Sequence, residues 1–178
     1  MSKAITSSFE DFYKKIKEIL DTARARVYQA ANYEMVRAYW SIGSTIVHEE
    51  QLGKDRAEYG KFLVENLSQR LSSEYGKGFD KTNVWNMIRF YRTFPTLDAV
   101  RQELSWTHYR HLMRVEKVNA REFYLNEAIK GNWSTRQLER QINSFYFERL
   151  LMSKDKKGLM VDTDREKEVL QNENIIKD

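Results

Sequence analysis

The chain has 178 residues, which is enough for one domain with a sizeable hydrophobic core. Hydrophobic residues make up 41% and aromatic residues 13%, which excludes a disordered chain, and a single proline with 7 glycines argues against a β-sandwich or a β-barrel. Cysteine is absent, which excludes a disulfide framework and a thiolate zinc site, and the formal net charge is only +4.

The N-terminal third predicts long amphipathic helices. Ser7 or Ser8 can cap a first helix, because apolar residues keep a helical period over residues 9–30. A second helical run covers residues 35–50, and Gly43 within it permits a close crossing of two helices. We interpret the two runs as a helical hairpin, or as one long interrupted helix, that serves as a scaffold or as a homodimer interface.

Residues 67–92 predict a helix-turn-helix. A helix over about residues 55–75 leads into a turn, where Gly76 and Gly78 supply the positive φ that ends a helix and reverses the chain. Asp80 follows at the N-cap position of the next helix, where its carboxylate can accept unpaired backbone amides. The sequence therefore predicts a tight turn between two helices.

The second arm of this motif has two distinct sides. Apolar residues at helical spacing predict its buried side, which carries Val84, Met87, Ile88 and Tyr91. Basic and aromatic residues fall on another side, which carries Lys81, Trp85, Arg89 and Arg92. Because cations bind phosphate and long side chains reach base edges, this side is a candidate DNA-reading surface. The alternative is a solvated charged face with Trp85 packed against a neighbouring helix.

Three further helices are predicted towards the C-terminus, and the last is the best marked. Ser105 is a candidate cap for the first, Asn119 for the second, which Gly131 closes, and Ser134 with Gln137 forms an S-x-x-Q capping box for the third. One face of the third helix is expected to carry Leu138, Ile142, Phe145 and Arg149, and another Arg136, Arg140, Asn143 and Phe147. Helix, turn and capped helix therefore occur twice.

Positive charge is concentrated after the glycine turn. Residues 1–76 hold 11 Lys and Arg against 11 Asp and Glu, whereas residues 77–157 hold 16 against 9 and residues 158–178 hold 3 against 6. The net charge of +7 in the middle segment is the electrostatic footprint expected for phosphate binding. From Ser153 onward the chain is polar and lacks a sustained apolar face, which predicts a linker or tail.

The sequence predicts no metal, no cofactor and no catalytic residue. His108 and His111 lie three apart on a predicted helix, but a metal site needs a third ligand and His48 is distant in sequence, so the pair is expected to hydrogen-bond locally or to face phosphate. The tail contains residues of the types that nucleases use, namely Asp162, Asp164, Glu166 and Lys167. That segment has no strand pattern to hold carboxylates around Mg²⁺, and the chain has no P-loop.

Four stretches are informative in combination. They are YWSIGSTI at residues 39–46, GFDKTNVWNMIRFY at 78–91, LSWTHYRHLMRV at 104–115 and AREFYLNEAIKGNWSTRQLERQ at 120–141. Together they span most of residues 20–150, and the chain thereby resembles a bacterial family, the YhcG-like proteins, in their N-terminal domain of unknown function. The resemblance implies a C-terminal restriction-endonuclease-like domain of the PD-(D/E)XK type that cuts DNA. The chain ends about where that nuclease half would begin, so we expect it to be absent here.

A second, local resemblance points to the same partner. Residues 104–115, followed by WSTRQLERQI, resemble the helix-turn-helix segment of ParB-type DNA-binding proteins. This resemblance implies that Thr135, Arg136, Gln137 and Arg140 would lie near the groove of a duplex.

The sequence thus predicts an all-α domain of about seven helices, with one or two helix-turn-helix units and a long N-terminal helical hairpin. Residues 1–152 would form this domain, with 1–52 as scaffold or dimerisation helices and 55–152 as the helix-turn-helix region. Residues 153–178 would be the polar linker or tail. The N-terminus lacks the apolar core of a signal peptide, and no run of 18 apolar residues occurs, so a cytoplasmic protein with no membrane partner is expected.

The predicted function is a non-catalytic DNA-binding module that delivers a nuclease half in cis. The alternative is a protein-interaction module that forms homodimers through the N-terminal helices and makes no direct DNA contact. The predicted DNA-binding residues are Lys77, Lys81, Asn83, Trp85, Asn86, Arg89, Arg92, Arg110, Arg114, Arg136, Gln137 and Arg140.

Overall fold

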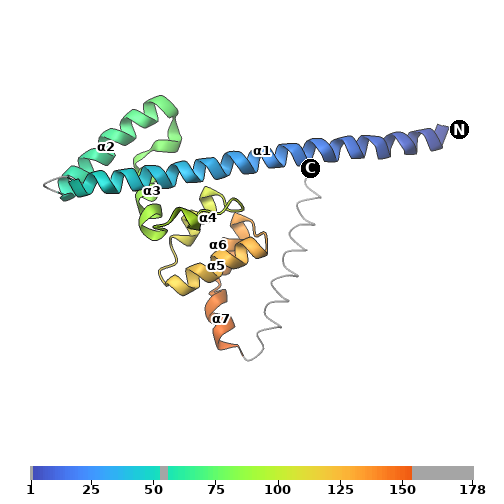
Figure 1. The fold of residues 1–178 in the computed structure, drawn as a ribbon. Helices are drawn as coiled ribbons and strands as arrows, with labels where there is room; N and C mark the ends of the chain where they lie inside the picture. Colours follow the sequence, from blue (N-terminus) through green and yellow to red (C-terminus); the bar gives the residue numbers. More distant parts are fainter. Residues whose placement is uncertain (1, 53–55, 154–178) are drawn as a thin grey trace.

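The computed structural model describes residues 2–52 and 56–153, and this part of the chain is all-α, without strands (Figure 1). Its α-helices are α1 (Ser2–Leu52), α2 (Arg56–Tyr75), α3 (Lys81–Thr93), α4 (Trp106–Leu112), α5 (Val118–Lys130), α6 (Thr135–Asn143) and α7 (Tyr146–Met152). Two short 3-10 helices, η1 (Lys77–Phe79) and η2 (Leu97–Ala99), lie before and after α3. The predicted all-α, multi-helix fold is confirmed. None of the described helices is both long and apolar enough to cross a bilayer.

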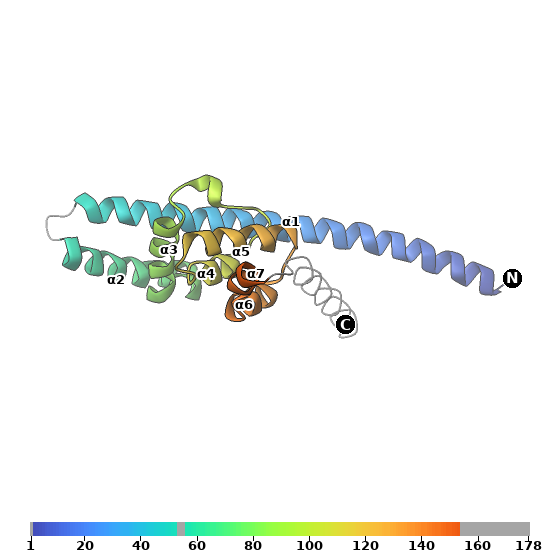
Figure 2. The same cartoon turned by 90° about the horizontal axis from the view of Figure 1, so that it is seen from below.

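Helix α1 is continuous, so of the two predicted alternatives for residues 9–30 and 35–50 the hairpin is wrong and the single long helix is correct, although the predicted interruption does not occur. No glycine or proline occurs before Gly43, and nothing in this stretch interrupts the backbone hydrogen bonds of a helix. The helix also begins at Ser2, ahead of the predicted cap at Ser7 or Ser8. The chain reverses only after Leu52, where α2 returns along the C-terminal part of α1 (Figure 2).

Helix α3 connects two hydrophobic cores. Ile88 and Val84 pack in a small cluster with residues of α1 and α2, including Ile46 and Val64. Phe90 packs in a larger cluster that holds α4, α5, α6 and α7 together. The predicted inward side of α3 is confirmed at Val84, Met87 and Ile88, which are buried, and Tyr91 is half-buried.

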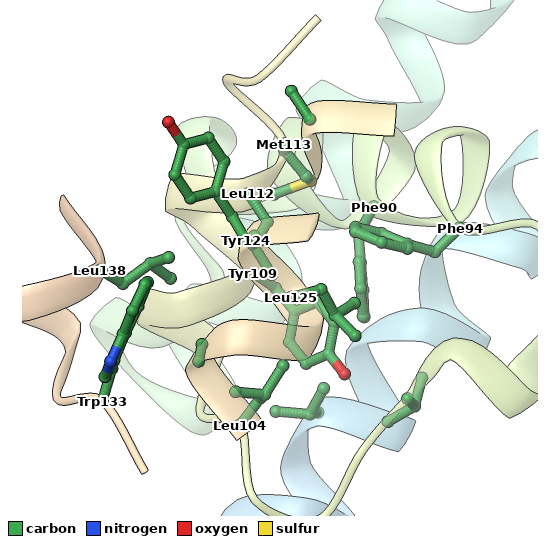
Figure 3. Packing of buried hydrophobic residues seen from close by; sticks show 14 of the residues in the cluster. Phe90, Phe94, Leu104, Tyr109, Leu112, Met113, Tyr124, Leu125, Trp133 and Leu138 are labelled. Carbon is green, nitrogen blue, oxygen red and sulfur yellow. The ribbon is translucent and has the colours of Figure 1, made fainter. Parts of the chain in front are cut away.

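The larger core contains aromatic rings in tilted and edge-to-face contact, with the buried tyrosine Tyr109 among them (Figure 3). The Tyr109 ring lies 4.7 Å from the Phe90 ring and 5.4 Å from the Phe94 ring, centroid to centroid. Its hydroxyl donates to the carbonyl of Ala99 at 2.9 Å and accepts from the backbone amide of Arg101 at 2.7 Å. Burial raises the pKa of Tyr109 to about 12. The loop between α3 and α4 is therefore tied to the core by a tyrosine that stays protonated.

The turn before α3 matches the prediction in part. Gly76 has φ 88° and occupies the left-handed region that favours glycine. Gly78 does not have positive φ, so its predicted role is wrong, because η1 (residues 77–79) continues the turn as a 3-10 helix. Asp80 is the N-cap of α3 as predicted, and its Oδ1 accepts from the amide of Asn83 at 2.9 Å.

Helices α5, α6 and α7 confirm one predicted N-cap and correct two boundaries. Ser134 and Gln137 form the capping box of α6, in which the Ser134 amide donates to Gln137 Oε1 at 2.7 Å. Asn119 does not cap α5, because that helix begins at Val118. Phe145 adopts φ 53° and separates α6 from α7, so it is exposed and does not extend the apolar face of α6. The predicted tail, with Asp162, Asp164, Glu166 and Lys167, lies outside the described residues.

Gly43 allows α1 and α3 to cross closely. A Cβ atom at this position would overlap the backbone carbonyl of Met87 in α3. The close crossing predicted for Gly43 is therefore confirmed, and its partner is α3. Gly78, in contrast, has only the Tyr39 hydroxyl within 4.0 Å of such a Cβ atom.

Gly43→Ala is expected to lower the free energy of unfolding by about 1–3 kcal/mol, because the added methyl group forces the two helices apart. Urea unfolding followed by circular dichroism measures the loss. Gly78→Ala is the matched control and is expected to stay within about 0.5 kcal/mol of the parent protein. Equal losses in the two variants would contradict a tight crossing at Gly43.

Candidate nucleic-acid interface

Two basic residues of α3 form ion pairs with other helices. Lys81 Nζ lies 3.1 Å from Glu65 Oε1 of α2, and both side chains are about half exposed. Arg92 Nη2 lies 2.8 Å from Glu50 Oε2 of α1. The Glu50 side chain is only 12% exposed, so Arg92 neutralises a carboxylate that is largely withdrawn from water. These two cations therefore already have anionic partners within the chain.

Other polar residues of α3 are also engaged. Arg89 Nη2 donates to the carbonyl of Met113, just after α4, at 2.8 Å. The Asn83 side chain donates through Nδ2 to the carbonyl of Gly78 at 2.5 Å and accepts at Oδ1 from Trp106 Nε1 at 2.9 Å. Both ends of the Asn83 amide are thus used to join η1, α3 and α4. To reach a base edge, Asn83 would have to break both bonds.

The remaining candidates around α3 are scattered. Trp85 is 37% exposed and lines a pocket of about 590 Å³ between α1, α2 and α3, together with Lys61 and Arg92. Asn86 is half-buried, and Lys77 is exposed on η1. Of these three predicted residues, only Lys77 carries a charge.

Helices α4 and α6 meet through a contact between a histidine and a glutamate. His111 Nδ1 of α4 lies 3.7 Å from Glu139 Oε1 of α6. Burial lowers the pKa of His111, the Glu139 carboxylate raises it, and Arg114 and Arg110 lower it. Both arginines are therefore close enough to His111 to act on its charge. Both are exposed: Arg110 lies on the side of α4 opposite the buried Tyr109 and Leu112, and Arg114 lies in the turn just after α4.

Helix α6 presents two more arginines beside this contact. Arg136 and Arg140 are one turn apart and exposed, whereas Leu138 and Gln141 are buried on the other side of the helix. Glu139 lies between the two sides and is the residue that meets α4. We call Arg110, Arg114, Arg136 and Arg140 together the α4–α6 face. These four predicted residues lie on either side of the contact between α4 and α6, with Arg110 and Arg114 at α4 and the other two on α6.

His108 and His111 do not point to a common site. The amide of Ser105 donates to His108 Nδ1 at 3.1 Å, and His108 Nε2 lies 2.9 Å from the carbonyl of Trp133. Because a carbonyl can only accept, Nε2 carries the hydrogen and the ring is neutral. Ser105 is the N-cap of α4, as predicted, and the buried His108 ring completes its capping box. The bond from His108 to Trp133 also holds the turn before α6 against α4. Among the described residues, no group of three or more metal-binding side chains is close enough to hold an ion.

Sequence reasoning missed the acidic partners of the basic residues. Glu50 lies 42 positions before Arg92, and Glu139 lies 28 positions after His111. Only pairs three or four positions apart can be inferred from helical spacing. Gln137 was predicted to contact DNA, and its carbonyl oxygen is used in the α6 capping box, which leaves its amide nitrogen to donate.

Comparisons with known proteins were consistent with one another. Residues 15–149 match the family described as the DUF1016 N-terminal domain. The chain is 31% identical, over 192 residues, to the Escherichia coli (strain K12) protein named "Putative nuclease YhcG", and the match covers 90% of this chain and 51% of that protein. The chain therefore spans about half the length of this curated relative. No solved structure matches it.

The stability of the protein is expected to fall as the pH falls below about 6.5, the ordinary pKa of histidine. Burial lowers the pKa of His108 in the folded state, so the unfolded chain takes up this proton first as the solution is acidified. Urea unfolding at pH 7.5 and at pH 5.5 measures the difference. His108→Gln should reduce the pH dependence in this range, and the remainder is expected from His111, whose pKa is also lowered by burial, whereas His48→Gln, at an exposed position, should keep the full dependence. An unchanged dependence in His108→Gln would show that His108 is not its source.

Proposed function

The chain belongs to the YhcG-like family of DUF1016 N-terminal domains, and from this premise we propose that it is the DNA-binding module of a nuclease-type protein. The relative in Escherichia coli carries the word nuclease in its name and is about twice as long as the aligned region. In the proposed division of labour, this chain holds the duplex and supplies no catalytic group. A nuclease half, joined in cis, performs the cleavage.

The observation that carries the proposal is the α4–α6 face. Four exposed arginines, one on α4, one in the turn just after it and two on α6, lie beside the contact of His111 with Glu139. Duplex DNA carries one negative charge for about every 1.7 Å of its axis, so cations held together on one surface bind it with a strong dependence on salt. Arginine also bonds phosphate with a planar, bidentate geometry that lysine lacks.

Helix α6 is the proposed reading helix. It follows α5 after the turn at residues 131–134, and its N-terminus is fixed by the Ser134 capping box. In helix-turn-helix proteins, the second helix enters the major groove with its N-terminal residues at base edges. Arg136 and Gln137 occupy that position here, and Arg140 lies one turn later. Arg110 and Arg114 would then bind the phosphates alongside.

Helix α3 is a weaker candidate for the same role. Its cations Lys81, Arg89 and Arg92 are bonded to other parts of the chain, and Asn83 is bonded on both sides. Each would have to exchange an internal partner for DNA, which reduces the net gain of binding. Together with Lys77, Trp85 and Asn86, these residues are assigned at most to outer contacts.

A second candidate function is a protein-interaction module. The observation that favours it is the N-terminal half of α1, which projects beyond the other helices (Figure 1) and exposes large apolar side chains to solvent. The two functions are compatible, because α1 and the α4–α6 face are different surfaces. A test of duplex binding distinguishes the two functions, because a module that only binds protein would not bind DNA.

The chain is expected to bind duplex DNA with an affinity that falls steeply as salt rises. Replacing Arg136 and Arg140 by glutamine should weaken binding and reduce the slope of log K against log [salt] by about 2, one for each phosphate that is no longer neutralised. The same result is expected for Arg110→Gln with Arg114→Gln. Fluorescence anisotropy with a labelled duplex, at salt concentrations from about 50 to 200 mM, around physiological ionic strength, measures the affinity and the slope.

The matched control is Lys61→Gln with Arg70→Gln, which removes the same charge from exposed positions of α2. This variant should bind almost as the parent protein does. An equal loss in the control would mean that net charge alone drives binding. No binding by the parent chain at low salt would refute the proposed function.

A further inference from the structure

The pocket beside Trp85 lies where α1, α2 and α3 come together (Figure 2). Each of the three helices contributes two residues to the argument, and these are Val47, Glu50, Gly60, Lys61, Trp85 and Arg92. Residues three or seven positions apart share one side of a helix, so the α1 pair and the α3 pair each face the same space. The volume of about 590 Å³ lies within the range of small-molecule sites, roughly 300–1,000 Å³. We call this space the Trp85 pocket.

The inner surface of the Trp85 pocket is mostly apolar. Val47 is buried and belongs to the small hydrophobic cluster of α1, α2 and α3, so the pocket rests on that core. The Trp85 side chain, in contrast, remains partly exposed. Planar rings pack favourably on an indole in offset or edge-to-face geometry. The apolar part of the pocket therefore suits an aromatic ring.

The Glu50 carboxylate is held between two helices at the edge of the pocket. A Cβ atom at Gly60 would lie 2.7 Å from Glu50 Oε1, so the missing side chain lets the carboxylate lie against α2. The other oxygen, Oε2, accepts from Arg92 Nη2 at 2.8 Å. This bond fixes the position of the Arg92 guanidinium before any ligand arrives. Groups that are already ordered lose less entropy when they bind.

The charged groups of the Trp85 pocket do not cancel. Lys61 and Arg92 are positive and Glu50 is negative, so two positive charges and one negative charge leave a net charge of +1. A guanidinium has five N–H donors, and the recorded bond from Arg92 to Glu50 uses one of them. Lys61 is exposed beside it on α2. One further negative charge therefore fits without displacing Glu50.

We propose that the Trp85 pocket binds a small ligand that combines a planar aromatic ring with one carboxylate. The ring packs on Trp85 and Val47, and the carboxylate accepts hydrogen bonds from Lys61 and Arg92. Hydrogen bonds between arginine and carboxylate are among the stronger ones in proteins, because both groups are charged and their geometries match. A cationic ligand would meet the net positive charge, and an aliphatic one would not use the indole.

This site is separate from the proposed DNA contact. The Trp85 pocket is formed by α1, α2 and α3, whereas the α4–α6 face lies on other helices. The proposal goes beyond the proposed function and does not rest on it. Failure of DNA binding in the anisotropy assay would leave the pocket unaffected, and an empty pocket would leave the DNA contact unaffected.

Binding is expected to be visible in the indole N–H signals of the whole chain, residues 1–178, labelled with ¹⁵N. The chain has four tryptophans, and Trp85→Phe identifies the signal of Trp85. The probe is 1-naphthoate, an aromatic ring with one carboxylate. It should shift the Trp85 signal saturably, with a Kd on the order of 1 mM for a fragment of this size. The indole N–H groups of Trp40 and Trp106 donate within the protein and should move less.

Two further probes separate the ring from the charge. 1-Naphthylmethylammonium has the same ring with a positive charge, and acetate has the carboxylate without the ring. Each should bind at least about 5-fold more weakly than 1-naphthoate, which corresponds to the loss of one favourable contact of the order of an exposed ion pair.

Lys61→Glu is expected to reverse this preference, because it changes the net charge of the pocket from +1 to −1. It should weaken 1-naphthoate by about 5-fold and strengthen 1-naphthylmethylammonium. The matched control is Arg70→Glu, an equal charge change at another exposed position of α2 outside the pocket. The control should bind both probes as the parent protein does, and circular dichroism verifies that both variants are folded.

Three outcomes would overturn the proposal. The absence of a saturable shift of the Trp85 signal would show that the pocket holds only solvent. Equal affinities for 1-naphthoate and 1-naphthylmethylammonium would show that Lys61 and Arg92 do not select a carboxylate. Equal effects of Lys61→Glu and Arg70→Glu would show that the overall charge of the protein, and not the pocket, determines the preference.

Discussion

The close crossing of α1 and α3 is the constraint on which the remaining structure depends. Gly43 removes a side chain at the point where the carbonyl of Met87 approaches, so the two backbones can touch. Around this point Ile88 closes the small core with α1 and α2, and Phe90 closes the larger core with the C-terminal helices. A helix held from both sides in this way positions everything that follows it.

This constraint also explains where the basic residues of α3 find their partners. A helix packed between two cores can place long side chains only at its margins, where the acidic residues of neighbouring helices lie within reach. Arg92 accordingly meets Glu50, and Lys81 meets Glu65. Helices α4 and α6 lie on the outer side of the larger core and keep one side exposed to solvent. The proposed DNA contact is therefore placed on the two shorter helices.

The sequence predicted local features well and long-range ones poorly. The caps at Asp80 and Ser134 depend on residues three positions apart, and both occur as predicted. The continuity of α1 was misjudged because a change of apolar face within a long helix resembles a turn when only periodicity is considered. The left-handed conformation of Phe145 carries no sequence signal, since that conformation is rare outside glycine, asparagine and aspartate. The pairing of His111 with Glu139 depends on how α4 and α6 pack, which spacing alone does not contain.

The uninterrupted course of α1 has a mechanical consequence. The helix is clamped from Tyr33 to Glu50, and the preceding 31 residues, from Ser2 to Asn32, extend about 46 Å from the clamp at 1.5 Å per residue. A tilt of roughly 10° at the clamp would move the far tip by about 8 Å over that length. The molecule thus contains a lever that pivots near Tyr33, where the helix begins to pack against the domain.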